Sequence, residues 1–186
     1  MEAIRNPHLS QSQAGFTLVE SVMALVIVAV LLCTAIPAMG GMLARHRLVT
    51  AQIELVAALQ HARGAAIIGR RRMLFCPSAN GAQCTDDTHW ENGWAIGRYR
   101  STNADQLEGA PSQVHGGYRQ LIITSTAGRK RIRFQPDGTT GGSNVTFVLC
   151  RPEHAEGALA VTVSNMGRVA GKVPGDDEAS RCAAGG

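Results

Sequence analysis

A single carboxylate stands inside the long apolar stretch near the start of this chain. The stretch reads QAGFTLVESVMALVIVAVLLC, and its acidic residue, Glu20, follows Gly15 by five positions. A carboxylate in a segment of membrane length costs roughly 2.5–3.5 kcal/mol on insertion scales. Because a lone helix gains nothing from that charge, we expect Glu20 to be used by a group outside its own helix.

The cysteines are spaced for disulfide bonds. Cys76 and Cys84 enclose the short loop CPSANGAQC, whereas Cys150 ends an apolar run and Cys182 lies near the last residue. Joining Cys76 to Cys84 and Cys150 to Cys182 is the preferred one of three connectivities. A zinc site is the alternative, but there is no CxxC pair and the six histidines are scattered. We therefore expect disulfides, no metal and an oxidising compartment, with Cys33, inside the apolar stretch, as a small buried side chain.

Arginines at two places have the chemistry to bind phosphate. In GRKRIRF, Ile132 and Phe134 are expected to share the buried face of a strand, which turns the arginines to the opposite face. Such a row suits a phosphate backbone, and a solvated sheet face is the alternative. The run Arg70-Arg71-Arg72 either contacts phosphate or complements the dipole of a helix that ends there. The arginines of the strand are Arg129, Arg131 and Arg133.

No constellation typical of an enzyme is found in the sequence. It contains no HExxH, GxSxG, Walker or GxGxxG motif. His89 beside Trp90 and Glu91 has acid and base groups, but a loop histidine among polar neighbours is more often simply solvated. We therefore expect no catalytic residue and no cofactor, and an enzyme is the weaker hypothesis.

Length and composition limit the number and class of domains that can carry these residues. With 186 residues, 45% hydrophobic and 17% charged, the chain fits an anchor followed by one domain. Only 4% of residues are aromatic and 21 are glycine, which favours a small sheet-rich domain over a large enzyme. The net charge of +4 permits nucleic acid or acidic lipid as a partner and requires neither.

The first 70 residues divide into three segments. Residues 1–15 are polar and are interpreted as a dispensable leader. Residues 16–36 are apolar over about the 20 residues that a membrane-spanning helix needs, and Pro37 with the glycine pair after it should loosen that helix. Residues 37–70 are expected to continue as an amphipathic helix that ends near Gly69. Its buried face is predicted to carry Leu48, Leu55, Leu59, Ala62 and Ala66.

Residues 71–186 are expected to form a β-rich domain, so the fold class is α+β. Short runs rich in β-branched and aromatic residues are separated by Gly, Asn, Asp and Pro. Asp137-Gly138 marks a chain reversal, and the polar stretch from Ser101 to Gly117 is expected to be a surface loop. The expected strands are MLFC, GWAIGRY, QLIIT, RIRFQ, VTFVLC, ALAVTV and GRVAGKV.

The start of the chain resembles the signal of type IV pilins and pseudopilins. A leader, a glycine, a phenylalanine, a glutamate and an apolar run occur together in AGFTLVESVMALVIVAVLLC. The resemblance implies that a prepilin peptidase cuts after Gly15 and methylates Phe16, and that Glu20 serves subunit assembly. A buried carboxylate is tolerable when the N-terminal ammonium of a neighbouring subunit pairs with it.

The rest of the chain resembles the FimT/GspH group of minor pilins. The motifs that carry this resemblance are HARGAAIIGRRRMLFCPSANGAQC, NGW, RIRFQPDG and GRV. It implies a long helix, its first half transmembrane, and a C-terminal globular domain of two antiparallel β-sheets. Some FimT-like pilins bind DNA through a GRxR motif, but this chain reads GRVA, so Arg168 carries over and the second arginine is missing. Lys172 restores a positive charge on the same strand face.

The resemblance implies a minor pilin of a type IV pilus that contributes to pilus assembly or captures DNA. Its expected partners are other major and minor pilin subunits, the prepilin peptidase, DNA and the inner membrane. The expected location is the bacterial inner membrane, with one membrane pass and a periplasmic C-terminal domain, and then the extracellular pilus. A minor pseudopilin of type II secretion is the alternative of similar architecture. A membrane-anchored periplasmic enzyme is the alternative from a different class.

Overall fold

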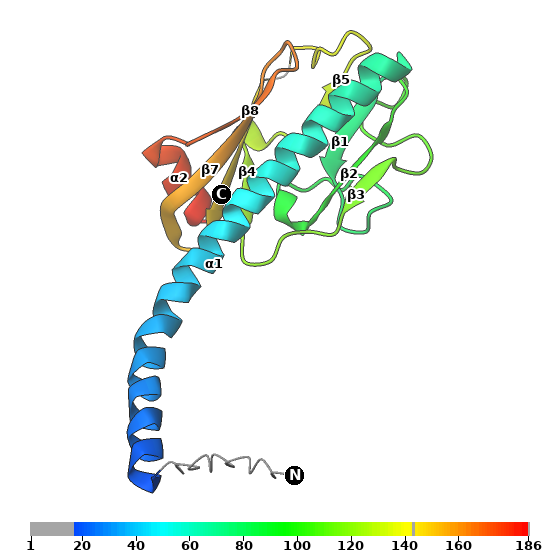
Figure 1. The fold of residues 1–186 in the computed structure, drawn as a ribbon. Coiled ribbons are helices and arrows are strands. Elements are labelled where there is room, and N and C mark those ends of the chain that lie inside the picture. The colour runs from blue at the N-terminus through cyan, green and yellow to red at the C-terminus, as the bar shows by residue number, and fades with distance from the viewer. Residues whose placement is uncertain (1–16, 143, 186) are drawn as a thin grey trace, which may run out of the picture. The chain divides into compact units, whose positions relative to one another are not determined.

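The computed structural model describes residues 17–142 and 144–185, without the side chains of residues 34–39 and Ala127. The chain divides into two compact units, Met1–Met42 and Leu43–Gly186. Figure 1 labels the two α-helices and most of the strands.

Helix α1 (Leu18–Gly69) is helical through Pro37 and the two glycines after it, so the expected loosening does not interrupt it. Before Met42 the described side chains of α1 are exposed. Cys33 is among them, so its interpretation as a buried side chain is wrong for the isolated chain. Within residues 17–142 and 144–185, no helix has the length and hydropathy needed to cross a membrane. The span expected at residues 16–36 stays a prediction.

From Leu43 onward, α1 buries one face against the strands of its own unit, and Figure 1 shows this part of the helix lying across both sheets. The side chains at the predicted positions are all buried, because apolar residues recur every three or four positions on that face. Each fully buried leucine contributes about 1.5–3 kcal/mol. The buried residues of this face are Leu48, Ala51, Leu55, Ala58, Leu59, Ala62 and Ala66.

Two four-stranded antiparallel sheets follow, which confirms the predicted fold class. The first sheet has the order β3-β2-β1-β5, with β1 (Met73–Pro77), β2 (Trp94–Arg98), β3 (Gln113–His115) and β5 (Ile132–Phe134). The second has the order β4-β6-β7-β8, with β4 (Ile122–Ser125), β6 (Val145–Arg151), β7 (His154–Val163) and β8 (Val169–Lys172). Two short 3₁₀ turns are η1 (Trp90–Asn92) and η2 (Thr126–Gly128).

Aromatic side chains join the inner faces of the two sheets. Phe75 of the first sheet stacks on Trp90 with ring centroids 5.1 Å apart, and Phe147 of the second meets Trp90 edge-on at 4.9 Å. Such offset and edge-to-face pairs add about 0.5–1.5 kcal/mol each beyond the area they bury. The core of the domain is therefore continuous between the sheets and α1.

Two elements were not expected from the sequence. Part of the predicted loop from Ser101 to Gly117 is strand β3, which pairs with β2 through Trp94 and His115. Helix α2 (Asp176–Ala183) covers the outer face of the second sheet. The reversal at Asp137-Gly138 is present, with the Gly138 N–H donating to the Gln135 carbonyl at 2.8 Å, but it connects strands of different sheets.

The C-terminus of α1 is capped by the backbone of the residues after it. The N–H of Arg70 donates to the carbonyl of Ile67 at 3.3 Å, and that of Arg71 to the carbonyl of Ala66 at 3.1 Å. This is the hydrogen-bond pattern of a Schellman motif. Arg70 occupies its left-handed position, with φ of 46°. Glycine is the usual residue there, because a side chain costs about 1–2 kcal/mol in this conformation.

Candidate functional site

The residues expected to be processed lie at the start of the chain, where Gly15 and Phe16 fall outside the described residues. Glu20 is described: it lies in the first turn of α1 with an exposed side chain. Its backbone N–H donates to the Thr17 hydroxyl at 3.3 Å. No hydrogen bond or ion pair of its carboxylate is found among the residues that the structure describes. The contact expected between Glu20 and another subunit stays a prediction.

Both disulfides have the pairing that the sequence favoured. Cys76 and Cys84 join β1 to the loop after it, with Cα atoms 5.5 Å apart. Cys150 and Cys182 join β6 to α2 across a Cα separation of 6.1 Å. In the described part of the chain, no cluster of three or more His, Cys, Asp or Glu side chains is placed to hold a metal ion. The cysteines are structural, and each bond pins a segment to a sheet.

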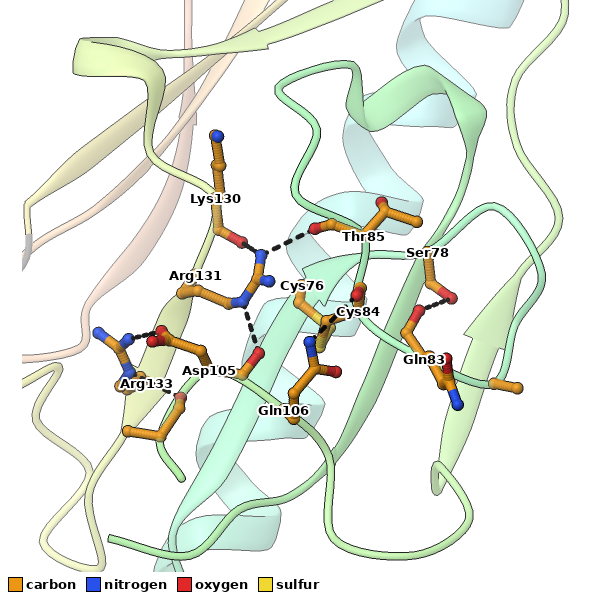
Figure 2. The surroundings of a disulfide bond; sticks show 12 residues. Cys76, Ser78, Gln83, Cys84, Thr85, Asp105, Gln106, Lys130, Arg131 and Arg133 are labelled. Carbon is orange, nitrogen blue, oxygen red and sulfur yellow. Dashed lines mark hydrogen bonds and ion pairs between the residues drawn. A yellow bond between two sulfur atoms is a disulfide. The ribbon is translucent and has the colours of Figure 1, made fainter. Parts of the chain in front are cut away.

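Arg133 of β5 and Arg131 just before it lie on the sheet face that the sequence predicted. Ile132 and Phe134 are fully buried on the inner face, whereas Arg131 and Arg133 lie on the outer face. Figure 2 shows what they contact there. Arg131 donates from Nε to the carbonyl of Asp105 at 2.7 Å and from Nη1 to the carbonyl of Thr85 at 2.9 Å. Arg133 donates from Nε to the carbonyl of Ala104 at 2.9 Å and pairs with the Asp105 carboxylate.

This arrangement holds two loops over the outer face, beside the Cys76–Cys84 bond (Figure 2). The guanidinium donors of Arg131 and Arg133 are therefore largely occupied by protein oxygens. Partial burial also lowers the pKa of Arg131, although Asp105 and Asp86 act in the opposite direction. Arg129, just after η2, is half-buried. The three residues do not form the open row of charges that would contact a phosphate backbone.

Arg168 lies on a turn held by close packing. Gly167 has φ of 72°, and a Cβ atom at that position would lie 1.9 Å from the carbonyl oxygen of Gly138. Arg63 of α1 donates to the Gly138 carbonyl at 3.1 Å and to the Met166 carbonyl at 3.3 Å, which fixes both turns. The glycine of the GRxR-like motif therefore has a structural reason to be glycine.

The second sheet turns Arg168 and Lys172 to its outer face, as the alternation of a strand predicts. The opposite alternation holds Gly171 against Gln52 of α1. Arg168 is exposed and lines a surface hollow of about 450 Å³ with Thr146, Thr162 and Ala170. The Lys172 ammonium lies 3.9 Å from the carboxylate of Glu178 on α2. Within the described residues, no hydrogen bond or ion pair of the Arg168 guanidinium is found, so the DNA contact expected of Arg168 and Lys172 stays a prediction.

The cluster at His89 has a structural role. His89 Nδ1 lies 2.9 Å from one carboxylate oxygen of Glu91, and the other oxygen accepts the backbone N–H of Ile123 at 3.0 Å. Glu91 therefore joins η1 to β4.

The structure also collects arginines that the sequence did not bring together. Arg98 and Arg100, at and beyond the end of β2, lie beside Arg70, Arg71 and Arg72. The antiparallel pairing of β1 with β2 explains this, because it sets Met73 opposite Arg98. In the sequence, basic residues stand just before β1 and at the end of β2. Because these two ends are adjacent in an antiparallel pair, this pattern could have predicted the cluster.

Comparison with known protein families identifies the family of the domain. Residues 51–167 match the family described as type II transport protein GspH, and residues 10–33 match the prokaryotic N-terminal methylation motif. The chain belongs to the GspH family. It is a minor pilin or pseudopilin, of a type IV pilus or a type II secretion system. Members of these families are structural components.

Solved structures of two proteins are similar to this chain. The type IV minor pilin FimU of Pseudomonas aeruginosa, in one crystal form, is 25% identical with a TM-score of 0.59, covering 75% of this chain and 96% of FimU. A second crystal form of FimU gives 25% identity and a TM-score of 0.56 over 73% of this chain and 99% of that chain. The minor pseudopilin EpsH of Vibrio cholerae is 10% identical with a TM-score of 0.49, over 69% of this chain and 98% of EpsH. No curated protein sequence is significantly similar to this GspH-family chain.

Proposed function

We propose that this GspH-family protein is a minor pilin of a type IV pilus that contributes to pilus assembly. The observation that carries the proposal is the methylation motif at residues 10–33 on a chain whose domain is similar to the minor pilin FimU. In this proposal the prepilin peptidase cuts after Gly15 and methylates Phe16. Residues 16–36 then hold the protein in the inner membrane, with the domain on the periplasmic side, until the subunit joins other pilins.

Glu20 is the assembly residue in this proposal. Its exposed carboxylate, without a partner in the described chain, supports a contact with another subunit. A carboxylate that enters an apolar filament core needs a compensating charge, and the new N-terminal ammonium of a neighbour supplies one.

Processing is tested by mass spectrometry of the membrane-bound protein from cells with an active prepilin peptidase. The expected chain begins at N-methylated Phe16, and Gly15→Leu retains the leader. A wild-type chain that keeps residues 1–15 in such cells contradicts the pilin role.

Assembly is tested with Glu20→Ala and Glu20→Gln. Both variants should be processed and inserted normally but should be depleted from sheared filaments, because neither carries the pairing charge. Glu20→Asp keeps the charge on a shorter side chain and serves as the control, with partial recovery. Normal incorporation of Glu20→Gln assigns Glu20 a role other than charge pairing.

A minor pseudopilin of type II secretion is the second candidate, favoured by the family match itself, which is described as a type II transport protein. Deleting the gene separates the two: loss of surface pili supports the pilus, and loss of an exported protein with normal pili supports secretion. DNA capture is a further proposed role of the pilus form, and its chemistry depends on which arginines are free to bind phosphate.

A further inference from the structure

Five arginines surround one hollow at the Gly69 end of the domain's helix. The hollow has a volume of about 570 Å³, and Tyr99 forms part of its wall. Three arginines follow α1 directly, and the other two come from the end of β2 and the residues after it. The arginines are Arg70, Arg71, Arg72, Arg98 and Arg100.

The charge of the hollow is only partly compensated. Its one acidic residue, Glu108, pairs with Arg100 at 2.7 Å, so five positive charges face one negative charge. The hydrogen bond from Arg100 lowers the pKa of Glu108, and the charges of Arg98 and Arg71 act in the same direction. Glu108 therefore stays ionised and cannot relieve the excess by taking up a proton near neutral pH.

Three of these guanidinium groups are free to bind a ligand. Arg72 lies 3.4 Å from the Gln135 side-chain oxygen and Arg100 is held by Glu108. Within the described residues, no hydrogen bond or ion pair is found for the side chains of Arg70, Arg71 and Arg98, and all three are exposed. Their backbones already cap the helix or pair in the sheet, so the side chains are not needed for either task.

The conformation of Arg70 adds a second observation. It occupies the left-handed position after the helix, where glycine fits without strain. The sequence places glycine one position earlier, at Gly69, and keeps an arginine where the backbone disfavours it. Strain of this kind is common where a side chain is needed for binding.

We propose that this hollow is a phosphate-binding site that contacts the backbone of DNA without reading its sequence. The proposal deepens the role in DNA capture and rests on it. Guanidinium groups match phosphate oxygens with paired N–H donors. Tyr99 cannot stack on a base, because its side chain is only 6% exposed and its hydroxyl accepts a hydrogen bond from Gln135. Contacts limited to phosphate position a protein on DNA but carry no sequence information.

The site is tested with the full chain in a non-ionic detergent, by anisotropy of a short fluorescein-labelled DNA duplex over a series of salt concentrations. The variant is Arg70→Ala with Arg71→Ala and Arg98→Ala. The matched control removes three exposed arginines elsewhere, with Arg45→Ala, Arg119→Ala and Arg181→Ala. A second comparison, Arg168→Ala with Lys172→Ala, tests the strand that the sequence predicted.

The wild type should bind duplexes of unrelated sequence equally. The hollow variant should lose on the order of tenfold or more in affinity at low salt, and the slope of log affinity against log salt should fall by about 2.7, or 0.9 for each of three phosphates. The control should change much less. An equal loss in the control overturns the site, because net charge alone then explains binding. A loss confined to the Arg168 and Lys172 variant moves the site to β8 and also overturns it.

Two competing polyanions identify the chemistry. Linear polyphosphate should displace the duplex from the wild type, whereas poly-L-glutamate at equal charge should displace it poorly. Tighter binding of polyglutamate would assign the hollow to an acidic protein surface and overturn the proposal. The amount of the hollow variant in sheared filaments is measured in parallel. Normal incorporation with lost DNA binding supports the site, and absence of the wild type from filaments would contradict the pilus role without touching the DNA result.

Discussion

The Nη1 atom of Arg131 donates to the backbone carbonyl of Thr85 at 2.9 Å, across 46 residues of sequence. The same guanidinium donates from Nε to the carbonyl of Asp105. One side chain just before β5 therefore holds the residue after the Cys76–Cys84 bond and a second loop at once.

We expect Arg131→Ala to destabilise the domain and to leave DNA affinity nearly unchanged. The substitution leaves loop carbonyls without donors, and hydrogen bonds to a charged group are worth about 1.5–3 kcal/mol. Urea unfolding measures the loss, with the exposed Arg119→Ala as the control. Arg131→Lys keeps the positive charge but lacks the planar set of guanidinium N–H donors, so most of the loss of stability should remain. If Arg131→Ala unfolds like the wild type but no longer binds DNA, then Arg131 binds phosphate and does not hold the loops.

A substitution at Gly167 distinguishes the cost of a left-handed backbone conformation from the cost of a steric clash with Gly138. Gly167→Ala places a Cβ atom 1.9 Å from the Gly138 carbonyl oxygen, in addition to the cost of its left-handed φ. Gly157→Ala is a matched control, because Gly157 has φ of 73° and nothing within 4 Å of the added atom. We expect about 1–2 kcal/mol for the control and a clearly larger loss at Gly167, measured by thermal unfolding. Equal losses would show that the turn moves aside freely.

The two disulfides should differ in their contribution to stability. In the chain-entropy treatment, a bond that spans 32 residues is worth about 3.7 kcal/mol, and one that spans 8 is worth about 2.5 kcal/mol. Cys150→Ala with Cys182→Ala should therefore cost more than Cys76→Ala with Cys84→Ala. Hydrogen exchange should also show that α2 loses protection selectively in the variant that lacks Cys150 and Cys182. Unchanged protection of α2 would mean that Ala179 and its apolar neighbours hold the helix without the bond.

Tyr118 predicts a loss of stability at alkaline pH. Burial raises the pKa of Tyr118 to about 12, although a hydrogen bond from Trp94 to its hydroxyl opposes the shift. The unfolded side chain ionises near pH 10.0, so the stabilisation is complete below that pH and is lost as pH rises toward about 12. The loss should reach about 2–3 kcal/mol. Urea unfolding from pH 8 to pH 12 checks this, and Tyr118→Phe should flatten the curve. A variant curve parallel to wild type would exclude Tyr118 as the titrating group.

Patterns of buried side chains were predicted well. The helix face from Leu48 to Ala66 and the strands rich in β-branched residues follow from periodicity alone, since each buries one regular face. Strand β3 has three residues, of which Gln113 and Val114 are exposed, so it carries no such pattern. Half of the residues of helix α2 are charged, and only Ala179 and Cys182 of this helix are buried. Its acidic first turn was the available signal.

The sequence predicted which face of the sheet the arginines lie on, but not which groups they contact. Alternation along the predicted strand placed Arg131 and Arg133 on the correct face, although β5 itself begins at Ile132. What they contact depends on loops that arrive from elsewhere in the chain, which no local pattern encodes. Arg98 and Arg100 meet Arg70 only after β1 and β2 pair, so their shared charge is a property of the sheet register.

The positions of the two disulfides along the chain have a consequence for maturation. The Cys76–Cys84 loop closes entirely before Cys150 is reached, and Cys182 follows 32 residues later. When the chain enters an oxidising compartment with its C-terminus last, each of these four cysteines meets its native partner before another of the four competes for it. Oxidation in order of emergence therefore favours the native connectivity over the two other pairings of these four cysteines.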